Sequence, residues 1–173
     1  MTSVTKLYDE DEIARRVEEL AGEIAGAVSG DFAIVALLKG SFVFVADLLR
    51  ELARRGLAPT VEFMRVSSYG GAKESSGAVR LIGEVPAGVA GRQVLLVDDI
   101  VDTGRSLAFA RDRLLEAGAS KIWTCTLLDK PSRRELALTV DFVGFVIEDV
   151  FVVGYGIDFA EQYRHLAYIG IIE

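Results

Sequence analysis

The run from Val94 to Leu107, Val-Leu-Leu-Val-Asp-Asp-Ile-Val-Asp-Thr-Gly-Arg-Ser-Leu, constrains the fold of this chain more than any other stretch. Its first four residues are apolar, as in a strand that is buried on both faces, and such strands are typical of parallel sheets. Two adjacent carboxylates follow, and a short loop then leads into a helical pattern from Leu107 to Leu115. We therefore expect an α/β fold with this loop at the carboxyl edge of a parallel sheet, where ligands of open α/β folds bind.

The loop that follows the acidic pair has the composition of an anion site. Amides at the start of a helix point outward, and the helix dipole adds to their attraction for an anion. Gly104 lets the backbone approach a ligand closely, while Thr103 and Ser106 add hydroxyl donors. These features predict that the loop binds a phosphate group.

The carboxylates around this loop need a different explanation, because they repel a phosphate. Asp98 and Asp99 would accept hydrogen bonds from sugar hydroxyls or help to hold a magnesium ion. Asp102 lies inside the loop and is the candidate general base. The alternative is an ordinary strand-to-helix connection in which Asp102 or Thr103 only caps the helix.

Size and composition set limits on the kind of protein. The chain has 173 residues, 51% hydrophobic residues, a net charge of -7 and one Cys. We expect a single domain over residues 1–173 with a sizeable core, and no disulfide within the chain. The acidic balance argues against a nucleic-acid partner, and no apolar run has the length of a membrane helix. The start of the chain lacks a signal-peptide pattern, so a cytoplasmic location is expected.

A second strand and turn repeat the logic of the first. The apolar run Phe32 to Leu38 predicts a buried strand, and a helical pattern from Phe42 to Leu52 follows it. Between them lies Lys39-Gly40-Ser41, for which the natural ligand is again an anion. The alternative is that Ser41 is a helix N-cap and Lys39 lies in solvent. Two such turns on one parallel sheet favour a shared ligand site.

The remaining pattern predicts more elements and one long polar loop. Asp9 and Glu12 have the spacing of a capping box, ahead of an amphipathic helix from Ile13 to Val28. Residues 67–78 contain almost nothing to bury, and we interpret them as a mobile lid, although a hairpin tip is the alternative. Cys125 is interpreted as core rather than as a reactive thiol. Further strands are expected at Val61–Val66, Val79–Val85, Ile122–Leu128, Val140–Ile147, Phe151–Asp158 and Tyr168–Ile172.

The central loop resembles the PRPP-binding motif of the type I phosphoribosyltransferases. Over nearly the whole chain the resemblance narrows to the hypoxanthine-guanine phosphoribosyltransferases. The motifs that carry it occur in that family's order, and they are Leu37-Leu38-Lys39-Gly40-Ser41, Ser67-Ser68-Tyr69-Gly70, the acidic loop, Leu127-Leu128-Asp129-Lys130, and Phe151-Val152-Val153-Gly154-Tyr155-Gly156-Ile157-Asp158.

The resemblance implies a fold and a reaction. The expected fold is a twisted parallel sheet flanked by helices, with a small hood from the terminal segments to which about residues 140–173 contribute. The expected reaction transfers the phosphoribosyl group of PRPP to hypoxanthine or guanine and gives IMP or GMP and pyrophosphate, with Mg²⁺ as cofactor. The expected partners are these small substrates and further copies of the chain, as a homodimer or homotetramer.

The resemblance also implies a role for each matching residue. Asp102 matches the general base at purine N7, and the lid residues Ser68 and Tyr69 would exclude water from the reaction. A cis peptide is expected between Leu38 and Lys39. The residues implied to bind PRPP are Lys39, Gly40, Asp98, Asp99, Asp102, Thr103, Gly104, Arg105, Ser106 and Arg164. The purine would contact Ile100, Lys130, Phe151, Val152 and Asp158, and magnesium would be held by Asp98, Asp99 and Asp158.

Two other classes of protein share part of this pattern. Signalling receiver domains carry a similar acidic pair and a Lys-Pro turn like Lys130-Pro131, but their acidic pair lies near the start of the chain, whereas here it lies in the middle. A phosphoribosyltransferase-like regulator that binds RNA is the second alternative. The acidic composition and the presence of Lys130, Phe151 and Asp158 weigh against it.

Overall fold

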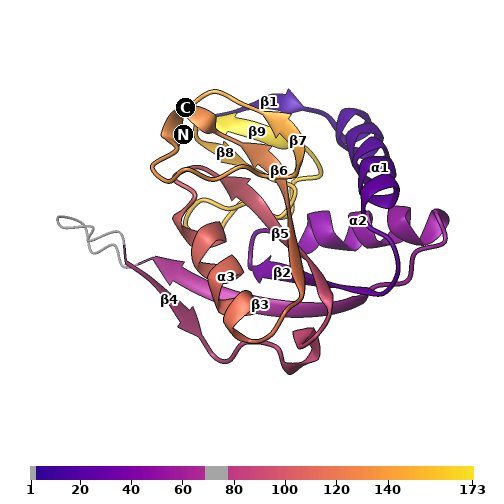
Figure 1. Cartoon of the computed structure of the whole chain (residues 1–173). Helices are drawn as coiled ribbons and strands as arrows, with labels where there is room; N and C mark the ends of the chain where they lie inside the picture. The colour runs from indigo at the N-terminus through magenta and orange to yellow at the C-terminus, as the bar shows by residue number, and fades with distance from the viewer. Residues whose placement is uncertain (1–2, 69–77) are drawn as a thin grey trace.

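The main sheet of the protein has six strands, most of them parallel. The structure is a computed structural model that describes residues 3–68 and 78–173, without the side chain of Ser68. The strands are β2 (Phe32–Leu38), β3 (Thr60–Ser68), β4 (Val79–Ile82), β5 (Gln93–Val101), β6 (Lys121–Asp129) and β7 (Phe142–Val146). Their order is β4-β3-β2-β5-β6-β7, and only β4 runs antiparallel to its neighbour (Figure 1). This arrangement confirms the α/β class.

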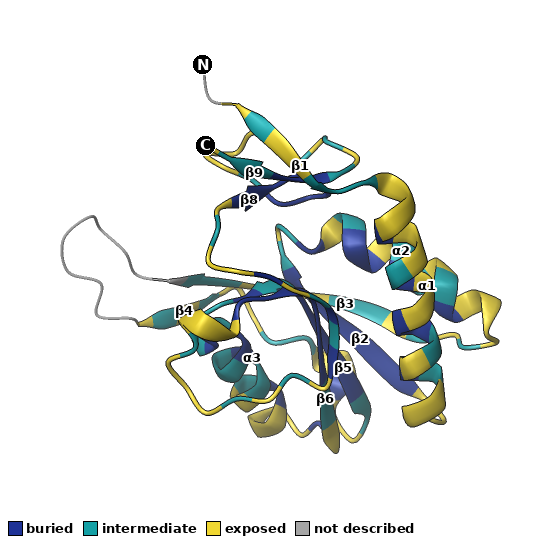
Figure 2. Ribbon diagram, turned by 90° about the horizontal axis from the view of Figure 1, so that it is seen from above, coloured by how far each residue is buried: buried dark blue, intermediate teal, exposed yellow. Residues whose placement is uncertain are grey.

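Helices cover both faces of this sheet. The two helices α1 (Glu10–Ala27) and α2 (Phe42–Arg54) lie on one face, and α3 (Arg105–Glu116) lies on the other (Figure 2). Short 3-10 turns form at η1 (Ala87–Val89) and η2 (Pro131–Arg133). Because β2 and β5 are apolar at successive positions, they feed a separate hydrophobic core on each side.

The helix ends agree with the sequence patterns. The amide of Glu12 donates to Asp9 Oδ1 at 2.8 Å, and the amide of Asp9 donates to Glu12 Oε2 at 2.8 Å. The capping box at the start of α1 is therefore confirmed. After the C-terminal end of α3, Gly118 has a φ of 97° and turns the chain away from the helix.

A second, smaller sheet forms the hood. It contains β1 (Val4–Tyr8), β9 (Ile169–Ile172) and β8 (Val152–Val153), all antiparallel, and Val4 pairs with Ile172. Figure 2 shows this sheet above the edge of the main sheet, with β1 from the start of the chain beside β9 from its end. The main sheet flanked by helices and the small hood from the terminal segments agree with the expected arrangement.

Four strand predictions were too long. The segment Phe151–Asp158 contributes only β8, because the chain turns at Gly154 and Gly156, whose φ angles are 97° and 94°. The strand expected at Val79–Val85 ends at Ile82, ahead of Gly83 with a φ of 85°. The strand expected at Val140–Ile147 is β7, which is Phe142–Val146, and the strand expected at Tyr168–Ile172 is β9, which begins at Ile169.

Two residues with reactive side chains lie outside the candidate site. Cys125 is fully buried, and burial raises the pKa of its thiol, which agrees with its interpretation as core. His165 is exposed. In the described part of the chain, no helix has the length and apolar character that a membrane span requires.

Candidate active site

The central loop and the Lys39-Gly40-Ser41 turn surround one pocket at the carboxyl edge of the sheet. Its volume is about 200 Å³. The predicted PRPP-binding residues that line it are Gly40, Asp98, Asp99, Asp102, Thr103, Gly104 and Ser106, and the predicted purine contact Ile100 lines it too. Both turns follow parallel strands that pair directly, β2 and β5, and this pairing brings them together.

The loop before α3 has the geometry of an anion site. Gly104 is the N-cap of α3 with a φ of 86°, and it lines the first pocket together with Thr103 and Ser106, so the start of the helix borders the pocket. The amide of Thr103 donates to Asp102 Oδ1, and the amide of Arg105 donates to Thr103 Oγ1 at 3.3 Å. Local hydrogen bonds of this kind belong to the capping alternative, but the N-cap itself is a glycine without a capping side chain.

The acidic pair is packed tightly into this edge of the sheet. Asp98 is 9% exposed, and burial raises its pKa well above the usual range, with a further increase from the neighbouring charge of Asp99. The carboxylate of Asp99 reaches the second turn, since a Cβ on Gly40 would lie 1.8 Å from Asp99 Oδ2. Any side chain at position 40 would therefore displace the Asp99 carboxylate from its present place.

The Lys39 turn confirms one expectation and corrects another. The Leu38–Lys39 peptide is cis, as the resemblance implied. Ser41 occupies the N-cap position of α2, but its hydroxyl makes no capping hydrogen bond and donates instead to the Leu37 carbonyl at 2.5 Å. The capping role is therefore wrong, because a cap accepts a hydrogen bond through its oxygen and no amide of the first turn of α2 donates to Ser41 Oγ. The contact with the Leu37 carbonyl leaves the hydroxyl proton unavailable to an anion.

A second pocket adjoins the first on the hood side. Its volume is about 220 Å³. All the predicted purine-contact residues line it, and they are Ile100, Lys130, Phe151, Val152 and Asp158. The candidate base Asp102 lines it too, as does Ile157, which the sequence did not indicate. Asp102 and Ile100 line both pockets, so the candidate base lies at their junction.

The walls of this second pocket suit a flat, polar-edged ligand. Lys130 is only 8% exposed, and its Nζ lies 4.0 Å from Asp149 Oδ1. Phe151 is 55% exposed and meets Phe159 edge to face, with 5.4 Å between ring centroids. One ring face for stacking and one ammonium for a carbonyl oxygen are thus present at the same site.

The third predicted metal ligand lies apart from the other two. Asp158 borders the second pocket and pairs with Arg164 at 3.2 Å, while Asp98 and Asp99 border the first. Among the described residues no group of three acidic, histidine or cysteine side chains forms a metal cage. The acidic pair still fits magnesium, which is usually held by one or two carboxylates together with the phosphates of a substrate.

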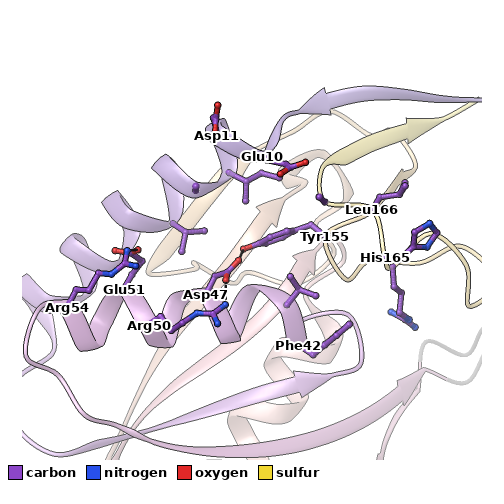
Figure 3. A pocket seen from close by; sticks show the side chains of 16 residues that line it. Glu10, Asp11, Phe42, Asp47, Arg50, Glu51, Arg54, Tyr155, His165 and Leu166 are labelled. Atoms are coloured by element: carbon purple, nitrogen blue, oxygen red, sulfur yellow. Dashed lines mark hydrogen bonds and ion pairs between the residues drawn. The ribbon is translucent and has the colours of Figure 1, made fainter.

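Arg164 borders a different pocket, of about 680 Å³, between α1, α2 and the segment 155–167 (Figure 3). Its Nη1 donates to the Gly156 carbonyl at 2.8 Å. In the same pocket the buried Tyr155 hydroxyl donates to Asp47 of α2, as Figure 3 shows. This contact joins the hood loop, residues 154–167, to α2, and the sequence pattern does not indicate it.

The predicted lid falls largely outside the described residues. Ser68 ends β3, but its side chain is not described, and Tyr69 lies outside the described ranges. Arg105 lies at the first turn of α3 and pairs with Glu135. Two residues that the sequence did not single out also contact the site, since Glu161 pairs with Lys39 at 2.9 Å and Arg134 donates to the Asp102 carbonyl at 3.2 Å.

Comparisons with known proteins agree with this geometry. The family model of the phosphoribosyl transferase domain matches residues 3–160. A hypoxanthine phosphoribosyltransferase of Escherichia coli is 43% identical over 171 residues, which cover 97% of this chain and 94% of that protein. A hypoxanthine-guanine phosphoribosyltransferase of Aquifex aeolicus is 43% identical over 169 residues, with 96% of this chain and 93% of that protein covered. A solved hypoxanthine-guanine phosphoribosyltransferase of Bacillus anthracis superposes with a TM-score of 0.91 at 40% identity and covers 99% of this chain and 100% of that one.

Proposed function

Because the chain belongs to the phosphoribosyltransferase family, in its hypoxanthine-guanine branch, we propose that its two adjoining pockets carry out purine salvage with PRPP. The chain is a transferase that moves the phosphoribosyl group of PRPP to hypoxanthine or guanine and releases pyrophosphate. The first pocket would take the ribose and its 5′-phosphate, and the second would take the purine. The observation that carries this assignment is that Asp102 lines both pockets.

The position of Asp102 fits the part of a general base. A base must lie within hydrogen-bond reach of the proton that it accepts. A purine in the second pocket would present its ring nitrogen to the ribose carbon in the first, and Asp102 lies where they meet. We assign it to the proton on purine N7, while Lys130 would contact the 6-oxo group and Phe151 would stack on the ring.

The charges of the first pocket match the charge that develops in the reaction. Cleavage between ribose and pyrophosphate makes the sugar more positive and the leaving group more negative. Asp98 and Asp99 would accept hydrogen bonds from the ribose hydroxyls, while the amides from Thr103 to Ser106 would hold the 5′-phosphate. Lys39, Gly40 and Arg164 would contact the pyrophosphate, and closure of the lid at Ser68 and Tyr69 would exclude water.

Magnesium is the proposed cofactor, and it would neutralise the negative charge of the diphosphate when bound. We assign Asp98 and Asp99 to it in the first pocket and Asp158 in the second, in each case with substrate oxygens completing the coordination. Burial and the charge of Asp99 raise the Asp98 pKa, and a nearby cation would favour the charged form of this carboxyl.

A homodimer or homotetramer is the proposed assembly. Phe42 at the start of α2 is 47% exposed and Phe63 on β3 is 51% exposed, which leaves apolar surface for a second copy to cover. We place the reaction in the cytoplasm because PRPP is highly charged and does not cross a membrane unaided. Size-exclusion chromatography with light scattering would measure the assembly.

The direct test is the release of pyrophosphate from PRPP in the presence of magnesium, with hypoxanthine, guanine, xanthine and adenine offered separately. We expect release with 6-oxopurines and not with adenine. Asp102→Asn preserves the shape of the side chain and should lower kcat about 10²- to 10⁴-fold, the usual contribution of a general base. If none of the four bases supported the release of pyrophosphate, the proposed function would be contradicted.

A further inference from the structure

The segment after β6, residues 130–136, is hydrogen-bonded to the loop that carries Asp102. Consecutive carbonyls of that loop accept hydrogen bonds from this segment. The Val101 carbonyl accepts from the Lys130 amide at 2.9 Å, and the Thr103 carbonyl accepts from the amides of Glu135 at 3.0 Å and Leu136 at 3.3 Å. The purine-side segment and the phosphate loop are thus bonded to each other along the backbone.

The Asp102 carbonyl, which lies between those of Val101 and Thr103, accepts a hydrogen bond from a side chain instead. Arg134 Nη1 donates to the Asp102 carbonyl at 3.2 Å, and Nη2 of the same guanidinium pairs with the carboxylate of Asp129. The side chains of this pair are 16% and 13% exposed. Asp129 is the last residue of β6 and directly precedes Lys130. One planar fork therefore bridges the end of β6 and the loop that carries the candidate base.

The direction of the Asp102 carbonyl decides the direction of the next amide. In a trans peptide the C=O and N–H groups point to opposite sides, and the only cis peptide among the described residues is at Leu38–Lys39. Because Arg134 and Glu135 bond to the carbonyls of Asp102 and Thr103, the amides of Thr103 and Gly104 point away from them, and the Thr103 amide donates to Asp102 Oδ1. We assign these amides to the 5′-phosphate, which would take the place of the contact between the Thr103 amide and Asp102.

The stem of Arg134 also fits the loop closely. A Cβ placed on Gly104 would lie 3.3 Å from Arg134 Cδ, so the loop backbone rests directly on this side chain. A shorter or differently shaped residue at position 134 would leave the loop unsupported. Small displacements matter here, since a misplacement of about 1 Å in a catalytic geometry can cost about 10²-fold in rate.

We propose that Arg134 is a positioning residue for phosphoribosyl transfer. With Asp129 as its anchor, it fixes the Asp102–Thr103 peptide so that the Asp102 carboxylate and the phosphate-binding amides face the substrates together. This inference rests on the proposed function, because it takes Asp102 as the base and the loop as the phosphate site.

The central experiment replaces Arg134 by Lys. A lysine keeps the positive charge beside Asp129, but its single ammonium cannot also hold the Asp102 carbonyl in the fork geometry. We expect Arg134→Lys to keep a melting temperature close to that of the wild type while kcat falls about tenfold or more and the KM for PRPP rises. The KM for hypoxanthine should change less than twofold, because the walls of the second pocket stay in place.

Further variants distinguish a loss of activity from a loss of folding. Arg134→Gln leaves the Asp129 carboxylate buried without its cation and is expected to destabilise the fold. The double variant Arg134→Gln/Asp129→Asn removes both charges and tests the loss of the fork in a neutral environment. The matched control is Arg133→Gln, since Arg133 is half exposed and pairs only with Asp149, at 3.8 Å, in the described part of the chain.

The outcomes separate this inference from the proposed function. An inactive wild-type protein would overturn the proposed function itself. An active wild type with an Arg134→Lys variant of unchanged kcat would overturn the positioning role alone, and so would a double variant that is folded and fully active. If Arg133→Gln lowered kcat as much as Arg134→Lys, charge in this region rather than the fork would be responsible, and the inference would fail.

Discussion

The acidic pair at the end of β5 places carboxyl groups where burial disfavours their charged form. Asp98 is almost fully buried beside the like charge of Asp99, and its pKa is raised in consequence. The Asp99 amide donates to Asp98 Oδ1 at 2.9 Å, which offsets part of this effect. A carboxylate that burial disfavours in the free protein is one that a bound cation would stabilise strongly.

The first prediction concerns stability in the absence of metal. Since the folded state keeps the Asp98 proton to a higher pH than the unfolded chain, its contribution to stability falls as the pH rises above about 4, the usual pKa of the group. Asp98→Asn removes this dependence and keeps the oxygen that accepts from Asp99. We expect the variant to exceed the wild type in free energy of unfolding by more at pH 7.5 than at pH 4.5.

Urea unfolding in EDTA at the two pH values measures this difference. Asp112→Asn, on the exposed face of α3, serves as the control and should show no such trend. A variant less stable than the wild type at pH 7.5, with no change between the two pH values, would contradict the assignment.

The second prediction concerns Glu161, whose carboxylate pairs with Lys39 at 2.9 Å and Arg164 at 3.2 Å. Its hydrogen bond from Lys39 lowers the Glu161 pKa. If these two cations bind pyrophosphate, the Glu161 carboxylate competes with it. We expect Glu161→Gln to tighten inhibition by pyrophosphate a few-fold, within the modest range typical of exposed ion pairs.

Product-inhibition kinetics at fixed hypoxanthine concentration would measure this change. Glu19→Gln is the matched control, because Glu19 forms a similar exposed pair with Arg16 on α1, away from both pockets. Weaker inhibition in Glu161→Gln would mean that the carboxylate orders the two cations rather than competing for them.

The sequence predicted where the acidic residues lie but not which residues support them. Asp98, Asp99 and Asp102 follow an apolar run directly, so local pattern fixes their place at the edge of the sheet. Arg134 is one of many arginines, and its importance depends on a contact across 32 positions that exists only after folding. Likewise, the Ser41 hydroxyl binds a carbonyl that the helix-cap pattern ignores.

At the level of elements, the hood loop after β8 is held by turns rather than by strand pairing. Tyr155 has a φ of 52° and lies between two glycines of positive φ. Its amide donates to the Leu166 carbonyl at 2.8 Å, and Gly156 approaches the Gly40 backbone so closely that a Cβ would lie 2.8 Å from the Gly40 oxygen. The hood loop therefore packs directly on the proposed pyrophosphate turn.

The third prediction tests the side chain that secures this loop. Tyr155→Phe keeps the buried ring and removes the hydroxyl that donates to Asp47. We expect the free energy of unfolding to fall by about 1 kcal/mol, the size of one hydrogen bond, and kcat/KM to fall a few-fold as the loop loosens. Denaturant unfolding and steady-state kinetics on the same preparation would measure both.

Tyr8→Phe is the control for this change. The Tyr8 ring stacks on Phe145 with 4.0 Å between centroids, and its hydroxyl makes no hydrogen bond within the described ranges. Loss of activity in Tyr8→Phe equal to that in Tyr155→Phe would show that the hood responds to any change and not to this tie.

The sequence predicted the elements of the main sheet more accurately than those of the hood. Continuous apolar runs identified β2, β5 and β6 to within a few residues. Alternating apolar residues and glycines at Phe151–Asp158 resemble a strand, but their positive φ angles cannot be inferred from composition. A pattern of this kind does not distinguish a strand from a series of tight turns.

At the scale of the whole molecule, the hood and the main sheet share one core. The cluster under α1 and α2 includes Leu20 and Leu48 as well as Val152 and Ile169 of the hood. Arg16 of α1 adds polar contacts, with hydrogen bonds to the carbonyls of β7 at 2.6 and 2.7 Å. We therefore expect the chain to unfold as one cooperative domain.

The fourth prediction follows from this cooperativity. A ligand that binds only the folded chain stabilises all of it, by about 2.7 kcal/mol at 100 times its Kd. For a chain of this length, that corresponds to a rise of about 5–10 °C in the melting temperature. We expect PRPP with magnesium to produce such a shift.

Thermal scans with and without magnesium would measure it. PRPP in EDTA should produce a smaller shift, and Asp99→Asn should reduce the magnesium-dependent part. An equal shift with and without magnesium would contradict the proposed role of the acidic pair in holding the cation.

The sequence did not predict which strands pair in the hood. Apolar runs indicated a parallel sheet, but the pairing of β1 with β9 joins segments from opposite ends of the chain. Neither segment carries a local signal for its partner, because pairing of short strands depends on what the rest of the fold brings together.

This pairing has a consequence for synthesis of the chain. Translation proceeds at about 5–20 residues per second, so β1 emerges from the ribosome on the order of ten seconds before β9. Until then the strands of the main sheet are already made, whereas the central strand of the hood is missing. The nascent chain thus contains the Asp102 loop before β9 is made, and β9 is the strand that closes the hood beside the proposed purine pocket.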